Sequence, residues 1–142
     1  MTGATSGETR SFRFVRWMAR MMLYSQYREI EVVGAEQVPE SGAVLFVANH
    51  FKSIVDSMAL LHAAPRPASP LAKAPLWDSK LFGPLLDAVG AVPVYRPQDM
   101  KETGRSARAN LATFESVWSR LRDGKAVAIF PEGVSQARPQ LM

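Results

Sequence analysis

Two residues that could act together in catalysis, His50 and Asp56, lie six positions apart in the stretch VANHFKSIVDSMALL (residues 47–61). A neutral imidazole held by a carboxylate is a common general base for taking a proton from a hydroxyl group. The sequence SIVD (residues 53–56) is also a capping pattern, in which Ser53 would be the N-cap of a helix and Asp56 its third residue. The two roles are compatible, because a carboxylate in a first helical turn can also accept a bond from an imidazole on the preceding loop.

Other charged residues could bind a substrate, although each has an ordinary structural explanation. Arg96 follows a predicted strand, and its guanidinium could grip a phosphate with two hydrogen bonds or simply face water. Glu132 and Gly133 belong to a PEG segment that could equally be a plain turn after a strand. Lys73 is one of several lysines, and His62 lies in an apolar helical pattern, where a structural role is expected.

The composition disfavours several other kinds of site. The chain has no cysteine, which excludes disulfides, thiolate zinc sites and a cysteine nucleophile. No metal site is predicted, because the two histidines fall on different elements and no carboxylates cluster. The serine-nucleophile pattern G-x-S-x-G and the phosphate-loop pattern G-x-x-x-x-G-K-S/T are both absent.

Apolar periodicity predicts an alternation of strands and helices that would position these residues. Gly83 and Pro84 are expected to break one of the helices in two, and the proline-rich residues 65–70 are expected to close the helix before it. Strands are predicted at residues 28–34, 43–48, 91–95 and 125–130, and helices at residues 10–27, 57–64, 75–90 and 104–122.

This order of elements predicts an α/β fold with a mainly parallel or mixed sheet and flanking helices, preceded by an N-terminal amphipathic helix. Residues 28–34 alternate polar and apolar side chains, as an edge strand does. Ligands of such sheets bind beyond the carboxyl ends of the strands. Three predicted strands end at NHFKSIVD, YRP and PEG, so their polar side chains are expected to converge on one edge. Such an edge suits a substrate that carries a phosphate and a hydroxyl group to be deprotonated.

The helix predicted at residues 10–27 has the pattern of a helix lying in a membrane interface, and the net charge of +4 suits an anionic partner. On a helical wheel its arginines fill an arc of about 120° and its apolar residues an opposite arc of about 200°, with Trp17 and Tyr24 at the border. A helix packed on its own domain, with the arginines facing water, would explain the same pattern. The sequence contains no run of 18 uncharged apolar residues and no secretory signal. The arginines are Arg10, Arg13, Arg16 and Arg20.

Three ordered blocks, NHFKSIVD, GAVPVYR and IFPEGVS, resemble the glycerolipid acyltransferase family, whose members include glycerol-3-phosphate and 1-acylglycerol-3-phosphate acyltransferases. The resemblance spans residues about 29–140, and AKAPLW (residues 72–77) is similar to a segment between the first two family blocks. The predicted organisation is a disordered lead (1–9), a membrane-interface helix (10–27) and the N-terminal part of an acyltransferase domain (28–142).

The resemblance implies a role for each candidate residue. His50 would be the general base, and Asp56 would hold its imidazole and stabilise the charged form. The donor would be a fatty acyl thioester on coenzyme A or acyl carrier protein, and the acceptor 1-acylglycerol 3-phosphate or glycerol 3-phosphate, with no metal or bound cofactor. The remaining residues would bind the acceptor, Arg96 and Lys73 through its phosphate and Glu132 and Gly133 by shaping its site.

The chain departs from the family pattern in two ways. The histidine and aspartate are spaced H-x₅-D rather than the commoner H-x₄-D, and this spacing resembles a subgroup related to fungal-type glycerol-3-phosphate acyltransferases. The chain also ends at Met142, where family members continue with further strands, helices and a fourth motif, so a fragment is expected. The strand at 125–130 would then lack covering neighbours, leaving apolar surface and a sheet edge exposed.

Rival interpretations are a lysophospholipid acyltransferase with another acceptor, a hydrolase that passes the acyl group to water, and a catalytically incomplete membrane- or lipid-binding fragment. A nucleic-acid partner would explain the charge but not the PEG segment or the apolar side of the first helix, and none is expected. The expected location is peripheral, on the cytoplasmic face of a membrane.

Overall fold

A parallel sheet of four strands forms the centre of the computed structural model, which describes residues 8–50, 54–96 and 108–132. The strand order is β1-β4-β2-β3, so the last of these strands in the sequence is inserted between the first two. All of the pairings are parallel, which confirms the predicted α/β class with a mainly parallel sheet. The strands are β1 (Val44–Val47), β2 (Ala68–Lys73), β3 (Val92–Val94) and β4 (Ala126–Ile129).

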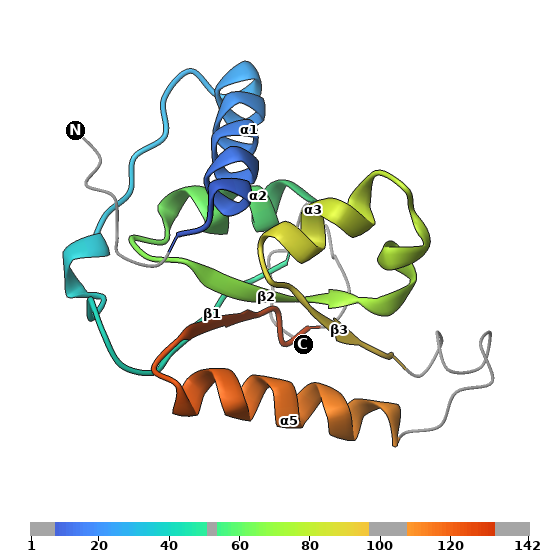
Figure 1. Cartoon of the computed structure of the whole chain (residues 1–142). Coiled ribbons are helices and arrows are strands. Elements are labelled where there is room, and N and C mark those ends of the chain that lie inside the picture. Colours follow the sequence, from blue (N-terminus) through green and yellow to red (C-terminus); the bar gives the residue numbers. More distant parts are fainter. Residues whose placement is uncertain (1–7, 51–53, 97–107, 133–142) are drawn as a thin grey trace.

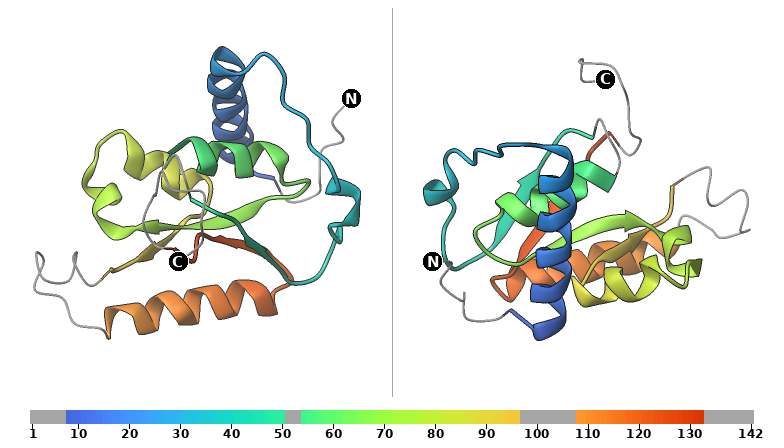
Figure 2. Two further views of the ribbon diagram at one scale, coloured as in Figure 1. Left: turned by 180° about the vertical axis from the view of Figure 1, so that it is seen from behind. Right: turned by 90° about the horizontal axis from the view of Figure 1, so that it is seen from above.

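Helices cover both faces of this sheet, with α1, α2 and α3 on one side and α5 on the other (Figures 1 and 2). The crossovers from β1 to β2 and from β2 to β3 run in one direction along the sheet, and the crossover from β3 to β4 runs back. Right-handed crossovers of opposite direction place their helices on opposite faces. The helices are α1 (Arg10–Gln26), α2 (Ile54–Ala63), α3 (Phe82–Ala88) and α5 (Ala109–Arg122), with 3₁₀ helices η1 (Ala35–Gln37) and η2 (Ala74–Asp78).

The central strand β4 is almost completely buried, because it is paired on both edges and α5 packs on it. The expectation that residues 125–130 lack covering neighbours is therefore wrong. The outer strands are β1 and β3, and the exposed apolar side chains of the sheet are Leu45 and Val47 on β1, 48% and 60% exposed. Small side chains in β4 let the layers approach closely, and Ala126 and Ala128 form a core cluster with Ala68.

Strand β2 is missing from the sequence-based prediction, which used the prolines of residues 65–70 to end a helix. Proline has no N–H to donate, so Pro70 argues against a central strand. The register explains why it is tolerated, since residues 68–70 pair with β4 and residues 71–73 pair with β3. Pro70 therefore lies where β2 changes partner and interrupts neither ladder in its middle.

The edge strand predicted at residues 28–34 does not form. These residues run from the end of α1 down to η1 as irregular chain (Figure 1), and Val33 is 83% exposed. An alternating sequence becomes a strand only where a neighbouring edge supplies hydrogen-bond partners. This segment has no strand partner among the described residues.

The helix predicted at residues 75–90 does form in two pieces, η2 and α3, but the break comes before Gly83. Pro84 lies in the first turn of α3, where the N–H that it lacks is not required. A side chain at Gly83 would meet the carbonyl oxygen of Trp77, because a Cβ there would lie 3.0 Å from it. Gly90 has φ = 64° just after the helix, the left-handed conformation expected of a C-terminal glycine.

Helix α1 is fixed to the domain by only one of its sides. It begins at Arg10 because the hydroxyl of Thr9 accepts a hydrogen bond from the Phe12 N–H at 3.1 Å. Arg16 fastens it further by donating to the Glu8 carboxylate at 2.6 Å and to the Ala64 carbonyl at 2.8 Å. The buried residues of the helix are Phe12, Val15, Ala19 and Leu23.

His62 of α2 lies at the interface between α1 and α2. Its ring meets the ring of Tyr24 edge-on, with centroids 5.8 Å apart, and the guanidinium of Arg20 lies 5.5 Å from the same tyrosine ring. Partial burial lowers the pKa of His62 from its ordinary value of 6.5, and the charges of Arg20 and Arg16 lower it further.

Acidification is expected to weaken this interface. Because the pKa of His62 is lower in the folded than in the unfolded chain, the unfolded chain binds the proton first as pH falls. The stability contributed by neutral His62 is therefore present above pH 6.5 and lost as pH falls below it. Urea unfolding at about pH 7.5 and about pH 5 should show a larger drop in midpoint for the wild-type chain than for His62→Gln. Equal drops in the two proteins would contradict the assignment.

Candidate active site

The carboxyl ends of the four strands lie along one edge of the sheet, and each is marked by a residue singled out from the sequence. In spatial order, His50 follows β1, Glu132 follows β4, Lys73 ends β2 and Arg96 follows β3. Adjacent strands are separated by about 4.8 Å, so the ends of β1 and β3 lie about 14 Å apart. The histidine and the arginine therefore mark opposite ends of this row.

His50 and Asp56 lie close together, as their spacing predicts. His50 Nδ1 is 3.3 Å from Asp56 Oδ2, and the two side chains are 17% and 21% exposed. The approach is close without being aligned as a hydrogen bond, since Nδ1 is buried and has no hydrogen-bond partner among the described residues. With Nδ1 turned toward the carboxylate, Nε2 on the other edge of the ring is the nitrogen that can accept a proton.

Asp56 is positioned by the start of α2. It lies in the first turn, where a negative charge is favoured by the helix dipole and by the unpaired N–H groups. The predicted N-cap, Ser53, lies outside the described residues. The location of Asp56 is thus compatible with both roles proposed for it, a stabilising charge at the helix start and a partner for His50.

Phe130 covers the imidazole of His50. The ring centroids are 4.4 Å apart and the ring planes are inclined by 32°. This contact follows from the register, because Val47 of β1 is opposite Ile129 of β4 and the next residue, Ala48, donates to the Ile129 carbonyl at 3.1 Å. Sequence reasoning did not single out Phe130, whose only signal was its place directly before the PEG segment.

Glu132 also follows β4, beside the position of His50. One carboxylate oxygen, Oε1, is buried and accepts no hydrogen bond from the described residues. A buried oxygen without a partner costs free energy, so a hydroxyl or N–H group of a ligand would bind there favourably. The neighbouring Gly133 lies outside the described residues.

Lys73 and Arg96 lie at the ends of neighbouring strands whose connections run over opposite faces of the sheet. Among the described residues, the α-helix that follows β2 is α3, on one face of the sheet, and the α-helix that follows β3 is α5, on the opposite face (Figure 1). Neighbouring strands with connections on opposite faces open a crevice at their carboxyl ends, where α/β proteins commonly bind ligands. Lys73 is exposed and is in register with Val94, two residues before Arg96. Two cationic residues are therefore located at strand ends where this topology favours ligand binding.

Two polar residues of α5 fix the backbone next to Arg96. The side chain of Asn110 accepts from the Tyr95 N–H at 3.0 Å and donates to the Tyr95 carbonyl at 2.8 Å. Thr113 donates to the carbonyl of Pro93 at 2.7 Å. Thr113 thus holds β3 itself, and Asn110 holds the residue just beyond its end. Sequence reasoning missed them, because a polar residue within a helix does not show which neighbour it contacts.

Neither a metal cluster nor a membrane span is found in the part of the chain that the structure describes. Within residues 8–50, 54–96 and 108–132, no three His, Cys, Asp or Glu side chains are grouped so that they could hold a metal ion. None of the helices in these ranges combines the length and the apolar character needed to cross a bilayer.

Comparisons with known proteins bear on this arrangement. The family described as Acyltransferase matches residues 29–142. A probable 1-acyl-sn-glycerol-3-phosphate acyltransferase of Mycoplasma pneumoniae is 31% identical over 86% of this chain and 44% of its own length. The chain thus spans less than half the length of that relative, and no solved structure matches it. Because the family match covers most of the sequence, the chain belongs to the acyltransferase family.

Proposed function

We propose that the chain transfers a fatty acyl group from a thioester, on coenzyme A or acyl carrier protein, to the free hydroxyl of 1-acylglycerol 3-phosphate. One observation carries this proposal, the placement of the His50–Asp56 pair and of Lys73 and Arg96 along the same sheet edge. Such an edge suits an acceptor with a hydroxyl group and a phosphate. The printed name of the Mycoplasma relative favours 1-acylglycerol 3-phosphate over glycerol 3-phosphate as that acceptor.

In the proposed reaction, Nε2 of His50 takes the proton of the acceptor hydroxyl while its oxygen attacks the thioester carbonyl carbon. Asp56 stabilises the imidazolium that forms. When the tetrahedral intermediate collapses, the C–S bond breaks and the imidazolium returns its proton to the leaving sulfur. The products are an ester and a free thiol, and His50 is neutral again.

Replacing the base should greatly slow acceptor-dependent turnover. Release of free thiol from palmitoyl-coenzyme A is measured with vesicles and 1-acylglycerol 3-phosphate, with glycerol 3-phosphate and with no acceptor. His50→Ala is expected to lower the acceptor-dependent rate by about 10²–10⁴-fold. His62→Gln is the matched control, because it replaces the other histidine of the chain, and it should keep the wild-type rate.

Two outcomes would contradict the proposal. Thiol release that is equal with and without an acceptor would indicate a hydrolase. No release with any acceptor would leave this chain as a catalytically incomplete domain or a lipid-binding module.

The cationic end of the edge is expected to bind the acceptor phosphate. Lys73→Ala should raise KM for 1-acylglycerol 3-phosphate by about 10–10²-fold, since a hydrogen bond to a charged group is worth about 1.5–3 kcal/mol. Steady-state kinetics with the acceptor and the donor varied separately will locate the effect. Lys80→Ala, which removes another exposed lysine away from the strand ends, should change neither KM. An unchanged acceptor KM in Lys73→Ala would remove this lysine from the site.

We further propose that α1 binds a membrane surface through the side that the domain leaves uncovered. Its apolar residues divide into two groups, and one group packs on the domain. The other contains Phe14, Trp17 and Met21, which are 57%, 57% and 52% exposed. At 100° per residue these three fall within an arc of about 60°, on the side of the helix opposite the buried residues. Large apolar side chains exposed together favour an apolar partner.

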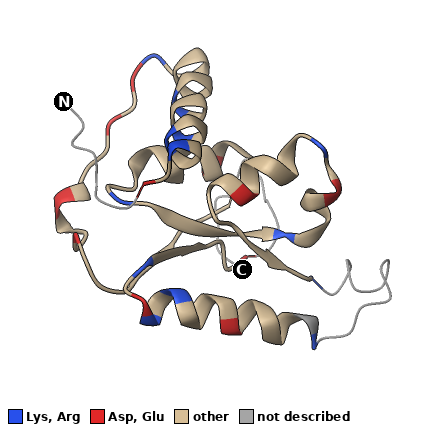
Figure 3. Cartoon of the chain, in the orientation of Figure 1, with Lys and Arg blue, Asp and Glu red and all other residues tan. Residues whose placement is uncertain are grey.

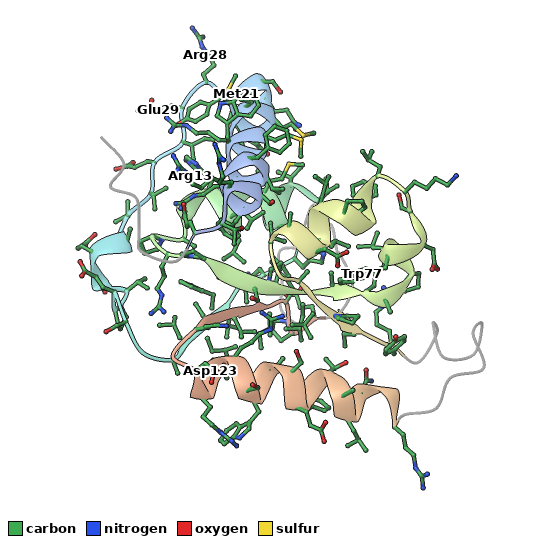
Figure 4. The ribbon with its side chains drawn as sticks, viewed as in Figure 1. Arg13, Met21, Arg28, Glu29, Trp77 and Asp123 are labelled. Atoms are coloured by element: carbon green, nitrogen blue, oxygen red, sulfur yellow. The ribbon has the colours of Figure 1, made fainter. Side chains whose placement is uncertain are left out.

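The charges around this exposed side favour an anionic lipid surface. Arg10, Arg13 and Arg20 of α1 are exposed, and the helix contains no acidic residue (Figure 3). Arg28, just beyond the helix, extends away from the domain (Figure 4). Arg16 does not belong to this group, because Glu8 and the Ala64 carbonyl already hold it. Basic residues beside exposed aromatic rings suit the anionic cytoplasmic leaflet, on which we place the chain.

Charge substitution on α1 tests this surface. Trp17→Glu should weaken co-sedimentation with vesicles of phosphatidylglycerol and phosphatidylcholine by at least about tenfold, because insertion of one large apolar side chain contributes about 1.5–3 kcal/mol. Trp118→Glu is the control, since α5 exposes Leu111, Phe114 and Trp118 at the same spacing but carries Glu115 among them. Equal loss of binding in the two variants would show that α1 has no special part.

A further inference from the structure

We propose that Phe130 is a positioning residue, which holds the imidazole of His50 in the plane that directs Nε2 toward the acceptor. The effect on catalysis rests on the proposed function, whereas the contact between the two rings does not. The two rings lie against each other, with centroids 4.4 Å apart and planes inclined by 32°. At this separation the rings are in van der Waals contact, so the imidazole cannot rotate out of its plane without displacing Phe130.

The carboxylate of Asp56 cannot fix that plane by itself. His50 Nδ1 lies 3.3 Å from Asp56 Oδ2, yet the contact lacks the alignment of a hydrogen bond. A carboxylate at this distance favours one of the two ring orientations that are related by a half-turn about the Cβ–Cγ bond, and it restrains smaller rotations only weakly. The ring of Phe130, which lies against the imidazole, restrains those smaller rotations. The two contacts thus act on one torsion in different ways, Asp56 by favouring one orientation and Phe130 by holding the plane.

The plane matters because it sets the direction of the Nε2 lone pair. A general base must come within about 2.6–3.2 Å of the oxygen whose proton it takes. A misplacement of about 1 Å in a reacting group can lower a rate by about 10²-fold. A phenyl ring is suited to this position, since it offers no group that would hydrogen-bond to Nε2 in place of the substrate.

The surroundings of Phe130 do not suggest a purely structural residue. The two buried apolar clusters of the described chain form around Phe12 and around Ala126, and Phe130 belongs to neither of them. It follows the last residue of β4 and is only partly buried. Its position one residue beyond the strand is set by the β1–β4 register, which also sets that of His50.

Replacement of the ring tests the proposal through kinetics. Phe130→Leu should lower kcat by about 10–10²-fold with KM for donor and acceptor changed less than about threefold. Phe130→Tyr keeps the ring and should restore kcat to within about threefold of wild type. The matched control is Phe46→Leu, which makes the same change in a phenylalanine of β1 that packs on the core cluster. It should lower stability without lowering kcat. An unaffected kcat in Phe130→Leu, or an equal loss in Phe130→Tyr, would overturn the proposal.

A second measurement needs no substrate and so separates this proposal from the acyltransferase activity. The chain has two histidines, so the ring resonances of His50 can be assigned with His62→Gln, and their line widths report rotation about the Cβ–Cγ bond. Wild type and Phe130→Tyr should give sharp His50 ring resonances, and Phe130→Leu should give resonances broadened by exchange between ring orientations. Equally sharp resonances in all three proteins would overturn the positioning role, whether or not thiol release is observed.

Discussion

The pairing of β1 with β4 is the interaction on which the rest of the structure depends. It joins residues 44–47 to residues 126–129, and it places β4 between two strands that precede it in the sequence. The ends of these two strands carry His50, Phe130 and Glu132, so their register decides how these side chains meet. The small, buried residues of β4 make the pairing possible, because larger side chains would hold the helices away from the sheet.

The sequence predicted those helices and strands whose apolar residues alone show which side of the element is buried. Continuous apolar runs indicated β1 and β4, and helical spacing indicated α1, α2 and α5. It missed β2, because proline rules describe a strand with continuous ladders and Pro70 lies where the ladder changes partner. It predicted a strand at 28–34 that does not form, because alternation describes the side chains and says nothing of a partner for the backbone. Both errors concern which strand a segment pairs with, and a local sequence pattern does not show that.

The same distinction applies to the candidate site and to α1. The approach of His50 to Asp56 was predictable, since both residues lie within one short stretch, whereas the contact of Phe130 with His50 depends on a register between distant strands. The helical wheel of α1 showed one broad apolar arc. The structure divides that arc into a side that packs on the domain and a side that remains exposed. A wheel cannot make this division, because both sides are equally apolar.

Strand order determines how far apart the candidate residues begin along the sheet edge. The base follows one outer strand and Arg96 follows the other, with Lys73 one strand nearer to the base. Since the strands are tied into one sheet, the separation of about 14 Å between these outer strand ends is set by backbone hydrogen bonds rather than by flexible loops. The two hydrogen bonds between the Asn110 side chain and the Tyr95 backbone also fix the position of the residue next to Arg96. The hydroxyl and the phosphate of 1-acylglycerol 3-phosphate are only a few bonds apart, so under the proposed function the side chains that bind them must reach toward each other along the edge. Lys73, one strand nearer to His50 than Arg96 is, has the shorter distance to span. The strand order therefore makes Lys73 the first candidate for the phosphate contact.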